Sequence, residues 1–551
     1  MTFAGRVLSS GKGAPFVIVA VSLLLMAPAL IDAGIVHGDF YVYARWQAHF
    51  AEAMAAGDLY PRWLPDLNQG LGSPAFFIYP PLGQWLGALL VPLLPGAQAA
   101  GLRLHIVLAG CLILSAFGTL LWLRWLGLGR PAALIGALTW LLLPYHAYLN
   151  LYQRGAFAEL VAMAALPWGL AFAHAVEQRR MLGWAGLTLS LAGLLLSNAP
   201  TALFGAPFTC LYAVLLSDRK DWLRLGVTIL SSAALAIALS AAWLWPALSQ
   251  VGLVNDRILF NDVYQPANYL IFSPTPWPNQ GVRIAATAIF LLHMAMLLLV
   301  ALAGGAAWGR ALLIAAAALI LLAMSELARP IWIAGMPWSK IQFAWRLLGL
   351  QSLLLAGLVG MGWQAVAARR KGLVRTILAW LLPGLLLIDA AFLAALSWHV
   401  ARRPVWPTPA VAAHRAEVRE YWLGDVDALA RRFGTNDAVA VSGRVEAGSL
   451  IRNGRSLTLD VRADGPALIA LRQFAYTGWT FRIDGGGWSR ASRSTTLPGL
   501  IEVPVPAGNH QIELHLPPLP AESRGLSVSR AALLLLLAGL LLAPLRRLLA
   551  R

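Results

Sequence analysis

Residues 101–123 read GLRLHIVLAGCLILSAFGTLLWL, and Arg124 follows them directly. The stretch contains one charged residue, Arg103, close to its start. A helix needs roughly 20 apolar residues to cross the hydrocarbon core of a bilayer, because lipid cannot hydrogen-bond to an exposed backbone. This stretch is long and apolar enough to span a membrane, and a basic residue at its end is typical of a membrane helix.

The same pattern recurs along the whole chain. Of the 551 residues, 59% are hydrophobic and 12% are charged, and the mean hydropathy is +0.67. A soluble globular chain carries about 25% charged residues. The composition therefore predicts a polytopic α-helical membrane protein. Apolar runs occur at 14–33, 82–95, 101–123, 131–147, 157–176, 181–197, 200–216, 223–248, 284–304, 310–328, 343–367, 376–397 and 529–545.

We expect about twelve of these runs to span the membrane. The run at 82–95 follows Tyr79-Pro80-Pro81 and has only about 14 residues, so we expect it to lie in the outer interface. Both termini and every strong basic cluster then lie in the cytoplasm, as the positive-inside rule requires. These clusters are Arg6/Lys12, Arg124/Arg130, Arg179/Arg180, Arg219/Lys220/Arg224, Arg310, Arg369/Arg370/Lys371/Arg375 and Arg546/Arg547/Arg551. In a Gram-negative envelope this places the protein in the inner membrane.

The formal net charge of +17 does not indicate nucleic-acid binding, because the basic residues cluster at the ends of apolar runs. The two cysteines, Cys111 and Cys210, lie inside apolar runs and define neither a disulfide nor a metal site. The first run, 14–31, lacks a small-residue cleavage site followed by a soluble chain. We expect it to be a retained helix and not a removed signal peptide.

The domain organisation follows from the spacing of the runs. Residues 1–397 form the transmembrane core with a long first outer loop at 34–100, and 528–551 form the last span and a basic cytoplasmic tail. Further outer connections are expected at 145–156, 249–283 and 326–342. Residues 398–527 lie between the transmembrane core and the last span. Apolar and polar residues alternate there at 456–462 and 511–516, and turn signals occur at 484–487 and 507–509. This pattern predicts a β-sandwich or jelly roll outside the cytoplasm. An amphipathic helix is predicted before it, at 414–433.

Ionisable residues near the membrane are the informative ones, because they are costly to place there. In the first outer loop, Asp39 precedes a predicted interfacial helix at 40–54. Asp39 is either a helix N-cap or a carboxylate that carries chemistry, and the two roles are compatible. His37 is near enough to hydrogen-bond it, although a lone loop histidine is more often structural. The same loop contributes Tyr43, Arg62 and Tyr79 as candidate substrate contacts.

Two further polar sets lie at outer helix ends. Arg154 and Glu159 are five residues apart, and they form either a local ion pair or an arginine that faces a phosphate and a glutamate that orients it. Gln342 and Arg346 stand at the start of another run. Arg346 either snorkels to the surface or binds a lipid phosphate.

Several motifs occur in a characteristic order along the chain. They are Asp-x-x-x-Tyr at 39–43, Tyr-Pro-Arg-Trp-x-Pro-Asp at 60–66, Gly-x-Gly-x-Pro at 70–74, Phe-x-Tyr-Pro-Pro-Leu at 77–82, Arg-Gly-Ala-x-Ala-Glu at 154–159, Ser-Asn-Ala-Pro-Thr-Ala-Leu at 197–203, Gln-Phe-x-Trp-Arg at 342–346 and Tyr-x-Gly-Trp-x-x-x-x-Asp-Gly at 476–485. This ordered set resembles the bacterial membrane proteins named 6-pyruvoyl-tetrahydropterin synthase-related, although nothing here indicates pterin chemistry. That family is similar in architecture to the GT-C glycosyltransferases, and the strand at 476–485 resembles the C-terminal domain of the related YfhO-like proteins.

The resemblance implies a GT-C-like fold whose outer loop carries a catalytic acidic residue, with a sugar donor on a polyprenyl phosphate. On this pattern Asp39 is the general base. The family has His four residues after that Asp, where this chain has Tyr43, which removes a polar ligand. No second acidic residue adjoins Asp39, so no metal site is specified and no cofactor is expected, while a divalent metal stays open.

These observations leave three hypotheses. The first is a polyprenyl-phosphate-sugar-dependent glycosyltransferase that acts on a lipid or polysaccharide acceptor at the periplasmic side. The second is a non-enzymatic membrane protein that binds or transports an envelope lipid or polysaccharide. The third is a scaffold whose sandwich recruits partners. The sequence contains no Gly-x-x-x-x-Gly-Lys-Ser/Thr loop and no Gly-x-Ser-x-Gly elbow, so ATP-driven transport and that type of serine hydrolase lack support. Membrane lipids are expected partners and nucleic acid is not.

Overall fold

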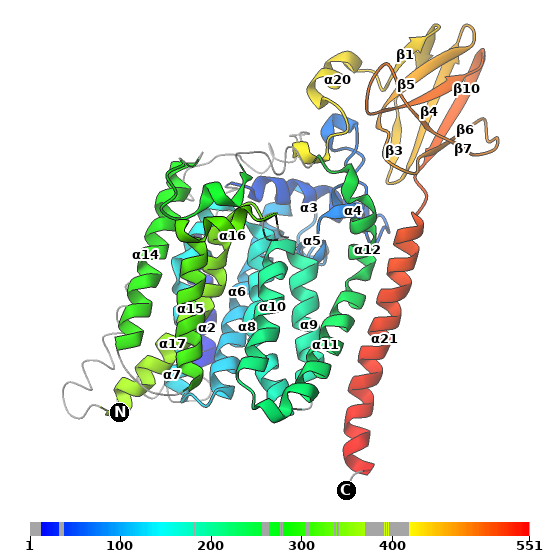
Figure 1. Cartoon of the computed structure of the whole chain (residues 1–551). Helices are drawn as coiled ribbons and strands as arrows, with labels where there is room; N and C mark the ends of the chain where they lie inside the picture. The colour runs from blue at the N-terminus through cyan, green and yellow to red at the C-terminus, as the bar shows by residue number, and fades with distance from the viewer. Residues whose placement is uncertain are drawn as a thin grey trace.

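The structure is a computed structural model, and it describes residues 13–31, 38–180, 182–255, 264–275, 277, 279–302, 308–335, 338, 341–369, 391, 393, 395 and 418–549. A bundle of helices carries a β-sandwich at one of its ends, and the long helix α21 (Pro520–Leu549) runs from the sandwich along the side of the bundle (Figure 1). We refer to the end of the bundle that carries the sandwich as the sandwich end.

Eight helical segments in the described ranges are long and apolar enough to cross a membrane, which makes this a multi-pass membrane protein. Three shorter apolar helices accompany them. Together they coincide with eleven of the twelve runs predicted to span, and the run at 376–397 falls almost wholly outside the described residues. The eight are α2 (Gly13–Ile31), η2 and α6 (Ala97–Trp125), α7 (Arg130–Leu142) with η3 (Tyr145–Arg154), α8 (Phe157–Glu177), α11 (Trp222–Leu239), α14 (Gln280–Leu302), η10 (Ala344–Leu347) with α17 (Leu348–Arg369), and α21. The three are α9 (Gly183–Ser197), α10 (Ala199–Leu215) and α15 (Trp308–Met324).

The run at 82–95 forms the short helix α5 (Leu82–Ala88) followed by turns. Seven helical residues extend for only about 10 Å, which is far too short to cross a bilayer. The helix α3 (Phe40–Ala55) is also as expected from the sequence, and it lies across the sandwich end of the bundle (Figure 1). The remaining helical segments are η1 (Asn68–Gly70), α4 (Ala75–Ile78), η4 (Arg219–Asp221), α12 (Ala241–Gln250), η5 (Val251–Leu253), η7 (Pro266–Tyr269), η8 (Glu326–Ala328), α16 (Arg329–Ile333), η11 (Arg419–Tyr421) and α20 (Val426–Phe433).

The core of the bundle forms around α8, which packs against α6, α9 and α10. Its small and aliphatic residues are buried along almost the whole length. A hydrogen bond between buried side chains also links α6 to α10, in which Trp122 Nε1 of α6 donates to the Tyr212 hydroxyl of α10 at 2.7 Å. The hydrogen bond satisfies a polar pair that lipid could not satisfy.

The domain outside the membrane is a sandwich of two antiparallel sheets. Alternation along β4 and β10 directs one face of each strand inward, as the period of two in the sequence predicts. One sheet has the order β1-β5-β9-β8, with β1 (Ala438–Ser442), β5 (Ala467–Phe474), β9 (Leu500–Val505) and β8 (Ser492–Arg493). The other has the order β2-β4-β10-β6-β7, and β3 also pairs with β4; its strands are β2 (Val445–Ala447), β3 (Ile451–Asn453), β4 (Ser456–Ala463), β6 (Thr480–Ile483), β7 (Ser489–Arg490) and β10 (Gly508–His515).

The sandwich is docked on the long first loop of the membrane core. Phe474 N donates to Leu71 O at 2.8 Å, and Trp63 packs edge-on against Trp479 at 5.7 Å between ring centroids. Trp63, Leu71 and Phe77 of the loop are buried in the same hydrophobic cluster as the sandwich core. Loop and sandwich therefore share a core, and the position of one fixes the position of the other.

Three sequence predictions need correction. The connection expected at 145–156 is mostly a π-helix, η3, which continues from α7 and ends at Gly155 with φ 64°. The amphipathic helix expected at 414–433 is reduced to η11 and the eight-residue α20, because Asp425 caps a new start by accepting from Ala428 N at 3.0 Å; residues 414–417 lie outside the described residues. Helix α21 begins at Pro520, ahead of the boundary expected at 528.

Candidate active site

Asp39 occupies the N-cap position of α3, but its side chain makes no capping hydrogen bond. Its backbone N–H instead donates to the carbonyl of Arg154 at 2.7 Å. Gly38 precedes it with φ 51°, and a Cβ there would collide with the backbone of Arg154. The glycine thus lets the chain pass close to the end of η3.

Asp39 is exposed at the surface, yet many protein atoms surround its carboxyl group, and we call these surroundings the Asp39 recess. Removal from bulk water raises its pKa above the usual value, while the guanidinium groups of Arg154 and Arg346 lower it and Glu159 raises it. Charged side chains from four elements, α3, η3, α8 and η10, therefore interact electrostatically around the Asp39 carboxyl group. A carboxylate that is accessible and perturbed in this way is a candidate functional group.

Glu159 holds the two arginines together. Its Oε2 accepts from Arg154 NH1 at 3.1 Å and lies 3.5 Å from Nε of Arg346. Its Oε1 accepts from the hydroxyl of Tyr145 and from Nδ2 of Asn150, the latter at 3.0 Å. Glu159 is buried, with 4% of its surface exposed. This is a buried, fully bonded carboxylate, and it fits the predicted orienting role better than that of an exposed ion pair at a helix end.

Both guanidinium groups also stack on aromatic rings. Arg154 lies 4.5 Å from the ring centroid of Trp345, and Arg346 lies 5.1 Å from that of Phe343. Arg346 NH1 donates to Ile341 O at 3.0 Å, while its Nε has no hydrogen-bond partner within the described residues. Gln342 precedes this segment with φ 65°. Arg346 is thus held in place by the Ile341 carbonyl, the Phe343 ring and the nearby Glu159 carboxylate.

Two tyrosines form one wall of the recess. The hydroxyls of Tyr43 and Tyr79 are 2.7 Å apart, and both side chains pack against Trp46. Burial raises the pKa of Tyr79 to about 12 and that of Tyr43 well above its usual value, and the negative charge of Asp39 adds to both shifts. Both phenols therefore stay neutral at physiological pH. Tyr43, where the sequence resemblance led us to expect His, is part of this hydrogen-bonded wall.

A cavity of about 10 Å³ lies behind Glu159 and Arg346, between α8, α10 and α17. It has room for about one water molecule. A sugar therefore does not fit in this cavity.

The structure does not bring Arg62 to this site. Arg62 Nε donates to Glu522 of α21 at 2.8 Å, and its NH2 donates to Ala242 O of α12 at 2.8 Å. Arg455 of the sandwich binds the same glutamate at 2.7 Å. Arg62 therefore belongs to a clamp that joins the loop, the sandwich and the last helix. His37 lies outside the described residues.

Sequence reasoning missed Glu420 and Tyr264. Glu420 is partly buried in the segment before the sandwich, and burial followed by repulsion from Asp39 raises its pKa. Burial and the same carboxylate also raise the pKa of Tyr264. Neither residue had a sequence signal. Glu420 stood among the charges of a predicted exposed helix face, and no motif marked Tyr264. Within the described ranges, no three His, Cys, Asp or Glu residues are placed to hold a metal ion.

The fold and the site define the class: a multi-pass helical membrane protein with a polar, ionisable site at the sandwich end of its bundle. Residues 76–397 match the family described as "6-pyruvoyl-tetrahydropterin synthase related domain; membrane protein". The chain belongs to this family, which confirms the family expected from the sequence. No curated protein matches the chain.

Several solved structures are similar to the chain at low identity. The arabinofuranosyltransferase AftD from Mycobacteria is 18% identical with a TM-score of 0.47, over 72% of this chain and 27% of AftD. The oligosaccharyltransferase of Archaeoglobus fulgidus is 14% identical with a TM-score of 0.49, over 72% and 56%. ArnT from Cupriavidus metallidurans is 16% identical with a TM-score of 0.38, over 72% and 74%. The chain thus spans about a quarter of AftD and just over half of the archaeal enzyme.

Proposed function

We propose that this protein is a GT-C-like glycosyltransferase that transfers a sugar from a polyprenyl-phosphate donor to a lipid or polysaccharide acceptor of the cell envelope. The observation that carries the proposal is the accessible Asp39 carboxylate beside two arginines that share Glu159. A base for the acceptor and cations for the leaving phosphate are the two groups that this reaction needs.

Asp39 acts as the general base. As the acceptor hydroxyl oxygen forms its bond to the anomeric carbon, the hydroxyl proton passes to the Asp39 carboxylate. The bond between that carbon and the phosphate oxygen breaks, and its electron pair leaves with the polyprenyl phosphate. A single displacement of this kind inverts the configuration of the anomeric carbon. Because burial raises the pKa of Asp39, its carboxylate is a stronger base than an ordinary aspartate.

Arg346 binds the leaving phosphate, supported by Arg154. Only 14% of the Arg346 side chain is exposed, so a phosphate oxygen that reaches the guanidinium meets a positive charge largely shielded from water. Glu159 keeps the guanidinium groups aligned before substrate arrives, which avoids reorganisation during the reaction. Gln342, Tyr43 and Tyr79 complete the proposed substrate contacts.

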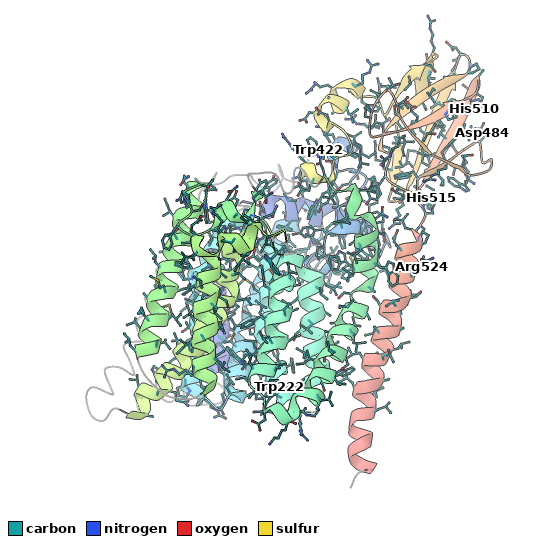
Figure 2. The ribbon with its side chains drawn as sticks, viewed as in Figure 1. Trp222, Trp422, Asp484, His510, His515 and Arg524 are labelled. Atoms are coloured by element: carbon teal, nitrogen blue, oxygen red, sulfur yellow. The ribbon has the colours of Figure 1, made fainter. Side chains whose placement is uncertain are left out.

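The placement of the site suits a lipid-linked donor. The phosphate would bind at the sandwich end of the bundle while the polyprenyl chain stays in the membrane. Trp222 lies at the opposite end of the bundle (Figure 2), and the basic segment η4 directly precedes it. Since basic connections face the cytoplasm, we assign the sandwich end to the periplasmic side of the inner membrane, with both termini in the cytoplasm.

The test is turnover of the purified protein with polyprenyl-phosphate-linked pentose and hexose donors, measured as release of polyprenyl phosphate in the presence of envelope extract. Loss of a general base costs about 10²–10⁴-fold, so Asp39→Asn is expected to reduce release by at least about a hundredfold. Asp66→Asn, an exposed aspartate of the same loop, is the matched control and should retain wild-type turnover. Full turnover by Asp39→Asn would remove Asp39 from the mechanism and favour a protein that binds or transports the lipid without chemistry.

A further inference from the structure

A second polar pocket lies in the sandwich, away from the Asp39 recess. The cavity is about 270 Å³ in volume and opens where the turn after β5 meets β7, β8 and β9. Its lining residues are Ala475, Tyr476, Thr477, Gly478, Trp479, Arg490, Ala491, Arg493 and Ile501. No acidic residue is among them.

Strand register places this pocket at the membrane-proximal end of the sandwich. His515, the last residue of β10, lies at the end of the sandwich next to α21 (Figure 2). Thr480 pairs with His515 and also with Arg490, so Arg490 and the turn just before Thr480 lie at this same end. The chain reaches Pro520, the first residue of α21, five residues after His515. Five residues extend for at most about 18 Å, so the pocket lies close to the membrane surface.

The pocket presents hydrogen-bond donors and positive charge. Arg490 and Arg493 are exposed, and neither has an acidic partner within the described residues. Trp479 Nε1 and the Tyr476 hydroxyl are buried, with 2% and 3% of these residues exposed, and neither atom has a hydrogen-bond partner in the described chain. Unpaired buried donors cost free energy unless a ligand or water meets them.

An acidic residue that acts on the pocket, Glu522, is already neutralised. Glu522 acts electrostatically on the Tyr476 hydroxyl, but its carboxylate is bound by Arg62 at 2.8 Å and by Arg455 at 2.7 Å. This cluster of one acid and two guanidinium groups has a net positive charge. The surroundings of the pocket therefore favour an anion.

The same end of the sandwich carries an aromatic side chain typical of membrane interfaces. Trp488 is 48% exposed, and its ring lies 5.9 Å from that of His515 and 4.7 Å from the guanidinium of Arg482. Tryptophan side chains with one apolar and one polar end concentrate at the level of lipid headgroups. An exposed tryptophan beside a cationic pocket at the membrane surface points to a lipid as the anion.

We propose that this pocket, built from Arg490, Arg493 and Trp479, binds the phosphate headgroup of an anionic lipid in the leaflet on the sandwich side. The lipid would fasten the sandwich to the membrane beside its contact with the first loop, where Trp479 packs against Trp63. The proposal does not depend on the reaction proposed for Asp39.

The test uses the full-length protein in detergent, titrated with short-chain phosphatidylglycerol and followed by native mass spectrometry. Each arginine near an anionic membrane surface strengthens association by roughly fivefold, so Arg490→Ala/Arg493→Ala is expected to weaken binding by about 25-fold. The control is Arg444→Ala/Arg462→Ala, which removes the same charge from the opposite end of the sandwich, where Arg462 pairs with Asn509. This control should bind as wild type does.

Phosphatidylcholine and inorganic phosphate distinguish the sources of binding. We expect weak binding of both, because the first is zwitterionic and the second has no chain to place beside Trp488. Strong binding of inorganic phosphate would show a free-anion site and overturn the lipid assignment, as would equal losses in the two double variants or no loss in either. Melting temperatures without lipid identify misfolding, and Arg490→Gln/Arg493→Gln, which keeps most of the side-chain volume, replaces the alanine variant if that variant unfolds.

Discussion

Glu159→Gln is the substitution that most directly tests the organisation of the site. The carboxylate accepts hydrogen bonds from Tyr145 and Asn150 and pairs with Arg154 at 3.1 Å and Arg346 at 3.5 Å. Glutamine keeps the size of the side chain and can still accept hydrogen bonds, but it removes the negative charge. Two largely buried guanidinium groups then lose the anion they share.

The expected cost follows from burial. Breaking a buried ion pair by removing one partner costs about 3–5 kcal/mol, because the remaining charge is left uncompensated. Arg154 and Glu159 have 9% and 5% of their side chains exposed, so the buried case applies. Since glutamine preserves the neutral hydrogen bonds, we expect the lower limit, about 3 kcal/mol, which corresponds to about 150-fold in the local opening equilibrium.

Hydrogen exchange of the backbone amides in η3, residues 145–154, measures this opening. We expect exchange there to accelerate by about 150-fold, while β5 in the sandwich exchanges as in wild type. The control is Glu326→Gln, whose ion pair with Arg329 is 32% and 30% exposed and is expected to contribute no more than about 1 kcal/mol. Unchanged exchange in η3, or an equal effect of Glu326→Gln, would refute the view that Glu159 holds the two arginines.

Three further predictions concern the clamp and the acidic residues. Glu522→Gln leaves two arginines unpaired, so exchange of residues 516–523 should rise about a hundredfold, whereas the exposed Glu446→Gln should change nothing. The folded state raises the pKa of Asp39, so ionisation of this carboxyl group destabilises the protein as pH rises through the raised pKa. Asp39→Asn should therefore raise the melting temperature at pH 7, and this gain should vanish as the pH falls towards 3.8. Glu420→Gln removes a charge that repels Asp39, so the acid limb of the pH–turnover profile should move to lower pH, and a move to higher pH would contradict this assignment.

Much of the fold could be predicted from the sequence, because hydrophobic length and period are local properties. Long apolar runs mark helices wherever they occur, and the strict alternation at 456–462 marks a strand. The π-helix η3 could not be predicted in this way. Its apolar pattern continues that of α7, but its polar residues suggested a loop. The start of α20 depended on one capping side chain, Asp425.

The site was predictable in part for the same reason. Asp39, Arg154 and Arg346 stand out in sequence because an ionisable residue at the edge of an apolar run is costly. Arg62 stands out equally, yet its partner is 460 residues away in α21, and no local pattern distinguishes a clamp from a site. Glu420 approaches Asp39 only because the sandwich docks on the first loop, which is a property of the tertiary structure.

The most direct test of the central claim, that a lipid phosphate binds at Arg346 beside Asp39, is the melting temperature of the purified protein with and without polyprenyl phosphate. A ligand at a hundredfold excess over its Kd stabilises the folded state by about 2.7 kcal/mol. We predict that the lipid raises the melting temperature of wild type, Asp39→Asn and the control Arg329→Ala, but not that of Arg346→Ala. Equal stabilisation of Arg346→Ala, or no stabilisation of any variant, would contradict the account.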